Sequence, residues 1–518
     1  MHQFPALRRA SLLLIAVAAL AVSATPLSTL SPQPDAALAA ITQQAAASES
    51  AGQSVGVIIR AAADTDSLVA AIEAAGGTVE RQYTIIPAVQ ATVSRSALAT
   101  LAADAAVAYI SLDAAIEMAT SDEIEDPLAP SPDSVFAALI RATDVWAAGI
   151  TGSGVGIAVI DTGINTRDAD FKGRIVATTS MLKGPSSDKT GHGTHVAGIA
   201  AGDGSRSNGR FTGVAPGANL IAVKVGNLDG VNVGDAIAGM EWVLENASRY
   251  NIRVVNLSFT SSVAESYLVS PLDAAVEQLW QQGIVVVAAA GNRGSDAFAA
   301  DHPPANDPFV ITVGAFSDEA TLDSADDFLK GWSSRGLSHD GFEKPEVVAP
   351  GSRLIATVGF TRAELIKLYP QNVIEGTYFQ MGGTSASAPV VAGVVALMLE
   401  ANPGLTPDQV KARIVAGADP LAGSLAPQID AWDAVFGGDV GLANQGVQFS
   451  LWIDPATGLI QNEPASLDSI TWDSITWDSI TWDSITWDSI TWDSITWDSI
   501  TWDSITWDSI TWDSIVIE

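Results

Sequence analysis

Short, continuously apolar runs separated by helical patterns constrain this chain most, because few folds accept them. The runs are VGIAVI (155–160), LIAVKV (220–225), RVVNLSF (253–259), IVVVAAA (284–290) and VITVGAF (310–316). Strands that are apolar on both faces are typical of a parallel sheet covered on both sides. Helical spacing recurs between the runs, as at Val233, Ile237 and Met240. We therefore predict an α/β domain over residues 135–440, with a parallel sheet and helices on both faces.

A smaller unit precedes this domain. Residues 54–119 give the order strand, helix, strand, strand, helix, strand, in which a helical stretch over 66–77 ends at a Gly-Gly pair. This order is a split βαβ arrangement, so we predict a small α+β domain here. Residues 120–134, which are polar and lack apolar periodicity, form a linker suited to proteolytic processing.

The N-terminus has the pattern of a secretion signal. Arg8 and Arg9 precede an apolar run over 11–22, and small residues follow it. We predict cleavage after Ala24, a signal peptide over 1–24 and a linker over 25–53. The protein is then secreted to the extracellular space, and we expect no membrane span after signal removal.

Composition excludes several classes of function. With 518 residues the chain is long enough for several domains, and its net charge is −34. Such acidity argues against nucleic acid or anionic lipid as partners. The chain has no cysteine, which excludes disulfides and thiolate catalysis.

The C-terminal segment over 466–518, which follows a linker over 441–465, consists of repeats. The pentapeptide Thr-Trp-Asp-Ser-Ile occurs nine times after a degenerate first copy. Short Ile-Thr-Trp strands with Asp-Ser corners would suit a stacked β-solenoid. A disordered acidic tail is the alternative. Surface attachment, ion binding and a removable extension are all compatible with it.

Three separated motifs supply the parts of a covalent catalyst. Asp161 lies in AVIDTGIN at a strand end, His192 lies in GHGTHVAGIAAG, and Ser385 lies in GGTSASAP before a long helix. A serine hydroxyl needs a base within hydrogen-bond reach, and the base needs a carboxylate that orients it. The chain order Asp, His, Ser is that of the subtilisin arrangement.

These motifs, with AAAGN (288–292), WSSRG (332–336) and KPEVVAPG (344–351), carry a resemblance to a family. Residues from about 150 to 420 resemble the subtilisin-like (subtilase) serine proteases. The unit over 54–119 resembles the inhibitor propeptide of that family. The resemblance implies protein or peptide substrates and the chain's own propeptide as an intramolecular inhibitor.

The resemblance also implies roles for individual residues. It assigns the base to His192 rather than His195, and the nucleophile to Ser385 rather than Ser387. Asn292 corresponds to the asparagine that donates to the oxyanion.

An extended substrate would pair with the strand that starts at Ser258. Family members often continue there with Leu-Gly-Gly, whereas this chain has Phe259, Thr260 and Ser261. We also assign Ala289, Ala290 and Gly291 to substrate binding, with small apolar walls for the primary pocket.

The family resemblance implies a structural calcium ion as the one expected cofactor, and none is required for the chemistry. Asp170 lies in RDADF, where family members often carry a calcium-ligand aspartate. Solvated loop carboxylates are the alternative.

The predicted function is a secreted serine endopeptidase that acts through an Asp-His-Ser triad and is made as a self-processing zymogen. One alternative is a catalytically inactive subtilase scaffold that acts in surface adhesion through its repeats. A peptide ligase or amidase on the same site is another. A serine-carboxyl protease would need a glutamate base, and His192 argues against it.

Overall fold

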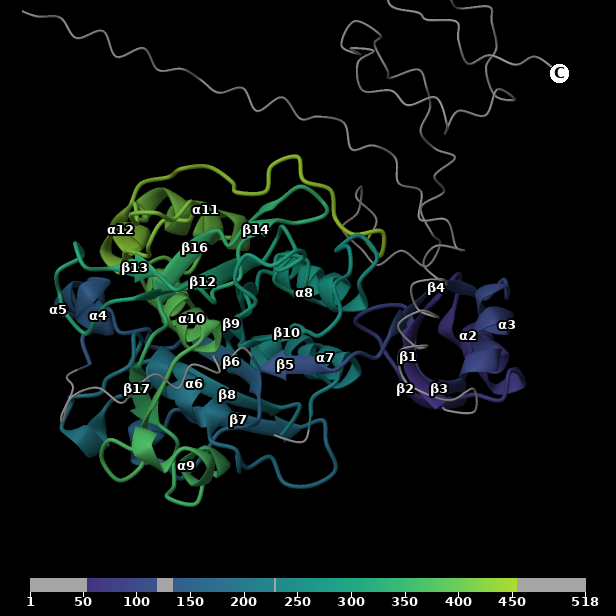
Figure 1. Cartoon of the computed structure of the whole chain (residues 1–518), viewed down its shortest axis with the longest axis horizontal. Coiled ribbons are helices and arrows are strands. Elements are labelled where there is room, and N and C mark those ends of the chain that lie inside the picture. The colour runs from purple at the N-terminus through teal and green to yellow at the C-terminus, as the bar shows by residue number, and fades with distance from the viewer. Residues whose placement is uncertain (1–53, 119–133, 228–229, 454–518) are drawn as a thin grey trace, which may run out of the picture. The chain divides into compact units, whose positions relative to one another are not determined.

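The computed structural model describes residues 54–118, 134–227 and 230–453 (Figure 1). The predicted signal peptide, the 25–53 linker and the repeats lie outside the described residues. So do residues 119–133 of the processing region and 454–465 of the second linker.

The N-terminal domain has the predicted element order. Its elements are β1 (Ser54–Ala61), α2 (Thr65–Ala74), β2 (Thr78–Gln82), β3 (Ala88–Ser94), α3 (Arg95–Ala102) and β4 (Val107–Leu112). The strands form an antiparallel sheet in the order β2-β3-β1-β4. Asp64 and Ser94 cap the two helices, and Leu68, Ile72 and Leu98 pack into a core of the domain's own.

The second domain is built on an eight-stranded sheet with the order β13-β12-β11-β9-β6-β8-β7, and β16 pairs with β12. Its strands are β6 (Gly156–Asp161), β7 (Ile175–Ser180), β8 (Asn219–Lys224), β9 (Ile252–Leu257), β11 (Val285–Ala289), β12 (Ile311–Ser317), β13 (Phe328–Leu329) and β16 (Val347–Pro350). Every pair except β12 with β13 is parallel. The predicted α/β class is therefore confirmed. Our prediction missed β7 because this edge strand alternates between half-buried and exposed residues.

Helices cover the sheet in two groups. The longer helices are α6 (His192–Ala201), α7 (Val233–Tyr250), α8 (Pro271–Gln281), α10 (Thr384–Ala401) and α11 (Pro407–Gly417). Helix α6 packs against α10, and α7 packs against α8. Pro271 at the first turn of α8 and a capping box at Thr406 and Gln409 set where two of them begin.

Shorter elements complete the second domain, apart from β5, which is the last strand of the N-terminal region and pairs with β10. They are β5 (Ile116–Met118), α4 (Phe136–Leu139), α5 (Ala142–Ala147), β10 (Phe259–Ser261), β14 (Gly336–Leu337), β15 (Glu343–Lys344), β17 (Leu354–Thr357), α9 (Glu364–Leu368), β18 (Tyr378–Met381) and α12 (Ala431–Phe436). Among the described residues only α10 is long and apolar enough to cross a membrane, and 89% of it is buried inside the protein. Helix α10 is therefore placed as a core helix in this structure.

Candidate active site

Asp161 and His192 meet at the carboxyl edge of the sheet. Asp161 is the last residue of β6, and His192 is the first residue of α6. Both side chains are buried, and His192 Nδ1 lies 2.8 Å and 3.0 Å from the two carboxylate oxygens of Asp161. An Nδ1–H that donates to this carboxylate leaves Nε2 with a free lone pair, which is the form a general base requires.

The surroundings of His192 set its basicity. Burial alone would lower the pKa of His192, but the charge and hydrogen bond of Asp161, with the charge of Asp188, raise it above its ordinary value. The net effect stabilises the imidazolium, as a base that takes a proton from a serine needs.

Close contact between β6 and α6 requires a glycine after the histidine. A Cβ on Gly193 would lie 2.2 Å from the carbonyl oxygen of Gly163 and 2.9 Å from Asp161 Oδ1. Any side chain here would push the helix away from Asp161. The glycine in the GHGTH motif thus has a steric reason in this structure.

Asp188 is a site residue that sequence reasoning missed. Its Oδ2 accepts hydrogen bonds from the N–H and the hydroxyl of Thr194, at 3.0 Å and 2.6 Å. Its Oδ1 accepts from Gly191 N–H and the Thr162 hydroxyl, at 2.9 Å and 3.0 Å. Asp188 therefore ties the start of α6 to the turn after β6. Its position four residues before the catalytic histidine candidate is the only signal the sequence carries.

The two rival residues make other contacts. His195 Nε2 lies 2.9 Å from the carbonyl oxygen of Phe379, and burial lowers the pKa of His195 to about 4. His195 is thus a neutral, packed histidine. The hydroxyl of Ser387 donates to the carbonyl of Ala349 at 3.2 Å.

Ser385 sits in the first turn of α10. The helix starts after Gly383, whose φ of +129° a residue with a side chain would rarely adopt. The Ser385 hydroxyl is buried and has no hydrogen-bond partner among the described residues. Backbone N–H groups in the first turn lack intrahelical acceptors and can donate to an anion there.

Asn292 lies beside this helix start. Its Oδ1 accepts hydrogen bonds from the N–H and the hydroxyl of Thr384, at 3.0 Å and 3.1 Å. Its Nδ2 is buried and has no partner within the described part of the chain. The Thr384 contacts therefore fix the amide so that its N–H groups stay free to donate.

Within the described residues, three buried polar atoms of the candidate site have no hydrogen-bond partner: His192 Nε2, Ser385 Oγ and Asn292 Nδ2. The His192 and Ser385 side chains are therefore not hydrogen-bonded to each other in this structure. Each such atom costs about 1–3 kcal/mol relative to a hydrogen-bonded one. Helices α6 and α10, which carry His192 and Ser385, pack against each other. Other buried atoms in the described residues also lack partners, as in Asp273 and Asn306, so the residue types at this site and the Asp161–His192 pair, rather than the missing partners alone, point to a reaction.

A strand of the chain's own N-terminal region lies along the predicted substrate strand. Strand β5 pairs antiparallel with β10, so that Met118 faces Phe259 and Glu117 faces Thr260. Ser258, which precedes β10, donates from its hydroxyl to the carbonyl of Ser385 at 2.9 Å. Strand β10 therefore leads directly to the candidate nucleophile.

The other predicted substrate residues differ in placement. Ala289 ends β11 and packs within the main hydrophobic core. Ala290 is also buried. Gly291 has a φ of +93° and donates from its N–H to the Thr384 hydroxyl at 3.0 Å. A wall of the primary pocket at Ala289 and Ala290 stays a prediction.

Both carboxylate oxygens of Asp170, the predicted calcium ligand, accept hydrogen bonds in this structure. Its Oδ2 accepts from the Tyr378 hydroxyl at 2.5 Å, and its Oδ1 accepts from Arg206 N–H at 2.9 Å. These are donors, whereas calcium needs six to eight oxygen ligands. Nowhere in residues 54–118, 134–227 and 230–453 do three or more His, Asp or Glu side chains form a group that could hold a metal. Calcium binding stays an untested prediction.

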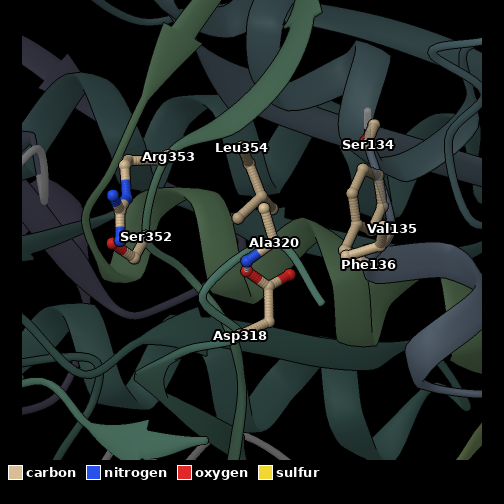
Figure 2. Close-up of a pocket in the computed structure, with 8 residues that line it drawn as sticks. All are labelled: Ser134, Val135, Phe136, Asp318, Ala320, Ser352, Arg353 and Leu354. Atoms are coloured by element: carbon tan, nitrogen blue, oxygen red, sulfur yellow. Dashed lines mark hydrogen bonds between the residues drawn. The ribbon is translucent and has the colours of Figure 1, made fainter. Parts of the chain in front are cut away.

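A small pocket lies elsewhere on the second domain and contains no residue of this site. Figure 2 shows its lining: Ser134, Val135, Phe136, Asp318, Ala320, Ser352, Arg353 and Leu354.

Comparisons with known proteins agree with this geometry. The model of the Subtilase family matches residues 152–439, and the model "Putative peptidase inhibitor domain" matches residues 17–113. Fervidolysin from Fervidobacterium pennivorans, a keratinolytic enzyme related to subtilisin, has a similar fold. Its TM-score is 0.56 at 22% identity, over 75% of this chain and 61% of that one.

Curated relatives carry protease names. Serine protease AprX from Bacillus subtilis is 40% identical over 278 residues, 52% of this chain and 62% of that protein. Subtilisin E from the same species is 34% identical over 67% of this chain and 80% of its own length. Subtilisin DY from Bacillus licheniformis is 36% identical over 55% of this chain and 91% of its own length. The predicted resemblance is confirmed: this chain belongs to the subtilase family of serine proteases and carries an inhibitor-like domain before its protease domain.

Proposed function

We propose that this protein is a secreted endopeptidase, made as a zymogen that cuts its own chain between residues 119 and 134. The observation that supports this most is the Asp161–His192 pair, together with the atoms on His192, Ser385 and Asn292 that have no hydrogen-bond partner among the described residues. The antiparallel pairing of β5 with β10 supports self-processing, because it carries the chain toward the nucleophile.

In the proposed mechanism, Ser385 Oγ attacks the carbonyl carbon of the scissile peptide bond. His192 Nε2 takes the hydroxyl proton and later donates it to the leaving amine, and Asp161 orients the imidazole and stabilises its charged form. Asn292 Nδ2 and the N–H of Ser385 donate to the oxyanion that forms. Water then attacks the acyl-enzyme with His192 as base, which restores the free serine.

The N-terminal domain acts as the inhibitor in this proposal. Its last strand occupies the edge that a substrate would use, so it competes with substrates until it dissociates. The arginine pair and apolar run over 8–22 support export.

A fluorophosphonate probe tests the proposed chemistry on the purified protein. We expect covalent labelling of Ser385, loss of labelling in Asp161→Asn and His192→Ala, and hydrolysis of a protein substrate that the probe blocks. Absence of labelling with retained fold would favour the inactive scaffold. Labelling that is accompanied by transfer to amines rather than hydrolysis would favour a ligase.

A further inference from the structure

Arg293, which follows Asn292, is aimed at the strand where a substrate would lie. Its Nη1 donates to the Thr260 hydroxyl at 2.9 Å, and its Nη2 donates to the carbonyl of Ser261 at 3.3 Å. Both acceptors belong to β10. The guanidinium is therefore fixed on the substrate strand by two separate contacts.

Two residues of the sequence allow the Arg293 side chain to lie on β10. Thr260 stands where family members often carry glycine, and its hydroxyl is one of the acceptors that hold Arg293. Gly291 leaves room for the guanidinium, since a Cβ there would lie 3.2 Å from Arg293 Nη1. The departure from the Leu-Gly-Gly pattern thus has a structural counterpart.

In the zymogen, the Arg293 guanidinium contacts an acidic side chain of the N-terminal region. Arg293 Nη2 forms an ion pair with Glu117, the residue that faces Thr260 in the β5–β10 register. The Arg293 side chain is 20% exposed and Glu117 is 58% exposed. Within the described part of the chain, no other carboxylate pairs with Arg293. Once the N-terminal domain leaves, this partly desolvated cation has lost its counterion.

We infer that Arg293, held by Thr260, makes this protease select substrates with an acidic side chain at the position that faces Thr260. This inference rests on the proposed function. A substrate that keeps the β5–β10 register would face Ser258 with the residue two positions C-terminal to the one that faces Thr260, and the Ser258 hydroxyl contacts the carbonyl of Ser385. The acidic substrate residue that Arg293 selects therefore lies two positions N-terminal to the substrate residue that lies beside Ser385.

The partial burial of Arg293 supports discrimination between acidic, neutral and basic substrate side chains at this position. Desolvation lowers the pKa of Arg293 and the Glu117 charge raises it, so the cation is partly removed from water and responds to an acid. A substrate carboxylate restores the pair, a neutral side chain leaves the cation uncompensated, and a lysine adds repulsion.

Internally quenched peptides test the inference on the mature enzyme. They carry the sequence of residues 113–122, with Glu, Gln or Lys at the position of Glu117. We expect kcat/KM for the Glu peptide to exceed that for the Gln peptide about fivefold, as for a partly exposed ion pair, and to exceed that for the Lys peptide further. The ratio should fall toward one in about 1 M salt, where the Debye length is about 3 Å.

Charge variants complete the test. Arg293→Gln should bring the ratio of kcat/KM for the Glu peptide to kcat/KM for the Gln peptide to within about twofold of one. Arg293→Glu should make the Lys peptide the best substrate. Arg335→Gln is the matched control, because the Arg335 backbone N–H donates to the carbonyl of Gly294, beside Arg293, whereas its side chain donates to the carbonyls of Gly331 and Ser333. The control should keep the ratio of the unchanged enzyme.

The outcomes separate this inference from the proposed function. Equal cleavage of all three peptides by the unchanged enzyme, or an unaltered preference in Arg293→Glu, would overturn the role of Arg293 while the protease assignment stands. Cleavage of none of them, together with no fluorophosphonate labelling, would overturn both.

Discussion

Two regions of the second domain differ in whether their polar groups have hydrogen-bond partners. At the active site, buried atoms on His192, Ser385 and Asn292 have no partners in the described chain. Where the N-terminal domain docks, several polar atoms are paired across the contact, although Arg60 and Arg81 each keep a buried nitrogen without a partner in the described residues. The Tyr83 hydroxyl donates to the carbonyl of Gly234 at 2.9 Å, and Gly234 N–H donates to Asp113 at 2.8 Å. In the proposed mechanism the first group of atoms is free to react, whereas the paired atoms of the second would bind water once the domains separate.

The N-terminal domain also supplies a cap for helix α7 of the second domain at this docking surface. The side chain of Asn232, at the N-terminus of α7, makes no cap hydrogen bond. Asp113 of the N-terminal domain accepts from the first turn of this helix instead. Charged groups therefore take part in the contact, and it should respond to pH.

Removal of the nucleophile should give the largest effect. We expect Ser385→Ala to lower turnover by about six orders of magnitude, which is the cost of losing the nucleophile of a subtilisin-type triad. The precursor should keep its N-terminal domain covalently attached, which mass spectrometry of the secreted protein measures. Ser387→Ala is the matched control and should still mature, because its hydroxyl only contacts the carbonyl of Ala349. Normal maturation of Ser385→Ala would refute self-cleavage.

Loss of the oxyanion donor should give the next effect. Asn292→Ala removes the free Nδ2 and should lower kcat by about two to three orders of magnitude, with a small change in KM. Steady-state kinetics with a peptide substrate measures both. Thr384→Ser, which keeps the hydroxyl that contacts Asn292, should stay close to the unchanged enzyme. An effect of Asn292→Ala on KM alone would contradict a role in the transition state.

Part of this site was predictable from sequence, because motif residues carry their chemistry in their identity. Asp161, His192 and Ser385 stand at strand and helix ends that apolar patterns reveal. Asp188 was missed because an aspartate in a polar loop has many ordinary roles. Its burial and the four hydrogen bonds it accepts appear only when the loop meets α6.

The docking surface was beyond sequence reasoning for a related reason. Ser111 and Glu265, which form a hydrogen bond at 2.9 Å, are separated by 154 positions in the chain. No local pattern encodes such a pair. The same holds for Arg293, whose direction depends on the positive φ of Gly291 and on contacts with β10.

The docked complex should weaken as pH rises through neutrality. Burial raises the pKa of Glu265 to about 7, while its hydrogen bonds with Ser111 and Tyr109 lower it. Burial also raises the pKa of Asp113. A raised pKa means that the docked state holds the proton more tightly, so this stabilisation is complete below the ordinary carboxyl range and is lost as pH rises through about 7.

The lag before activity appears in the processed, still associated complex measures this dependence. We expect the lag to shorten about tenfold between pH 6 and pH 8, because the pKa of Glu265 in the docked state is about 7. Glu265→Gln, which cannot ionise, should flatten most of this dependence, and Asp113→Asn should flatten the remainder. A lag that lengthens with pH would show that other groups control release.

The smallest effect should come from Glu241 on α7. Its Oε1 accepts from the Thr84 hydroxyl at 2.6 Å and from Ile85 N–H at 3.1 Å, and so holds one loop of the N-terminal domain. Because this contact is partly exposed, we expect Glu241→Gln to shorten the lag only about fivefold. Glu245→Gln, one turn further along the same helix and exposed, is the matched control and should leave the lag unchanged. If both variants shorten the lag equally, the net charge of α7 rather than the Glu241 contacts holds the domain.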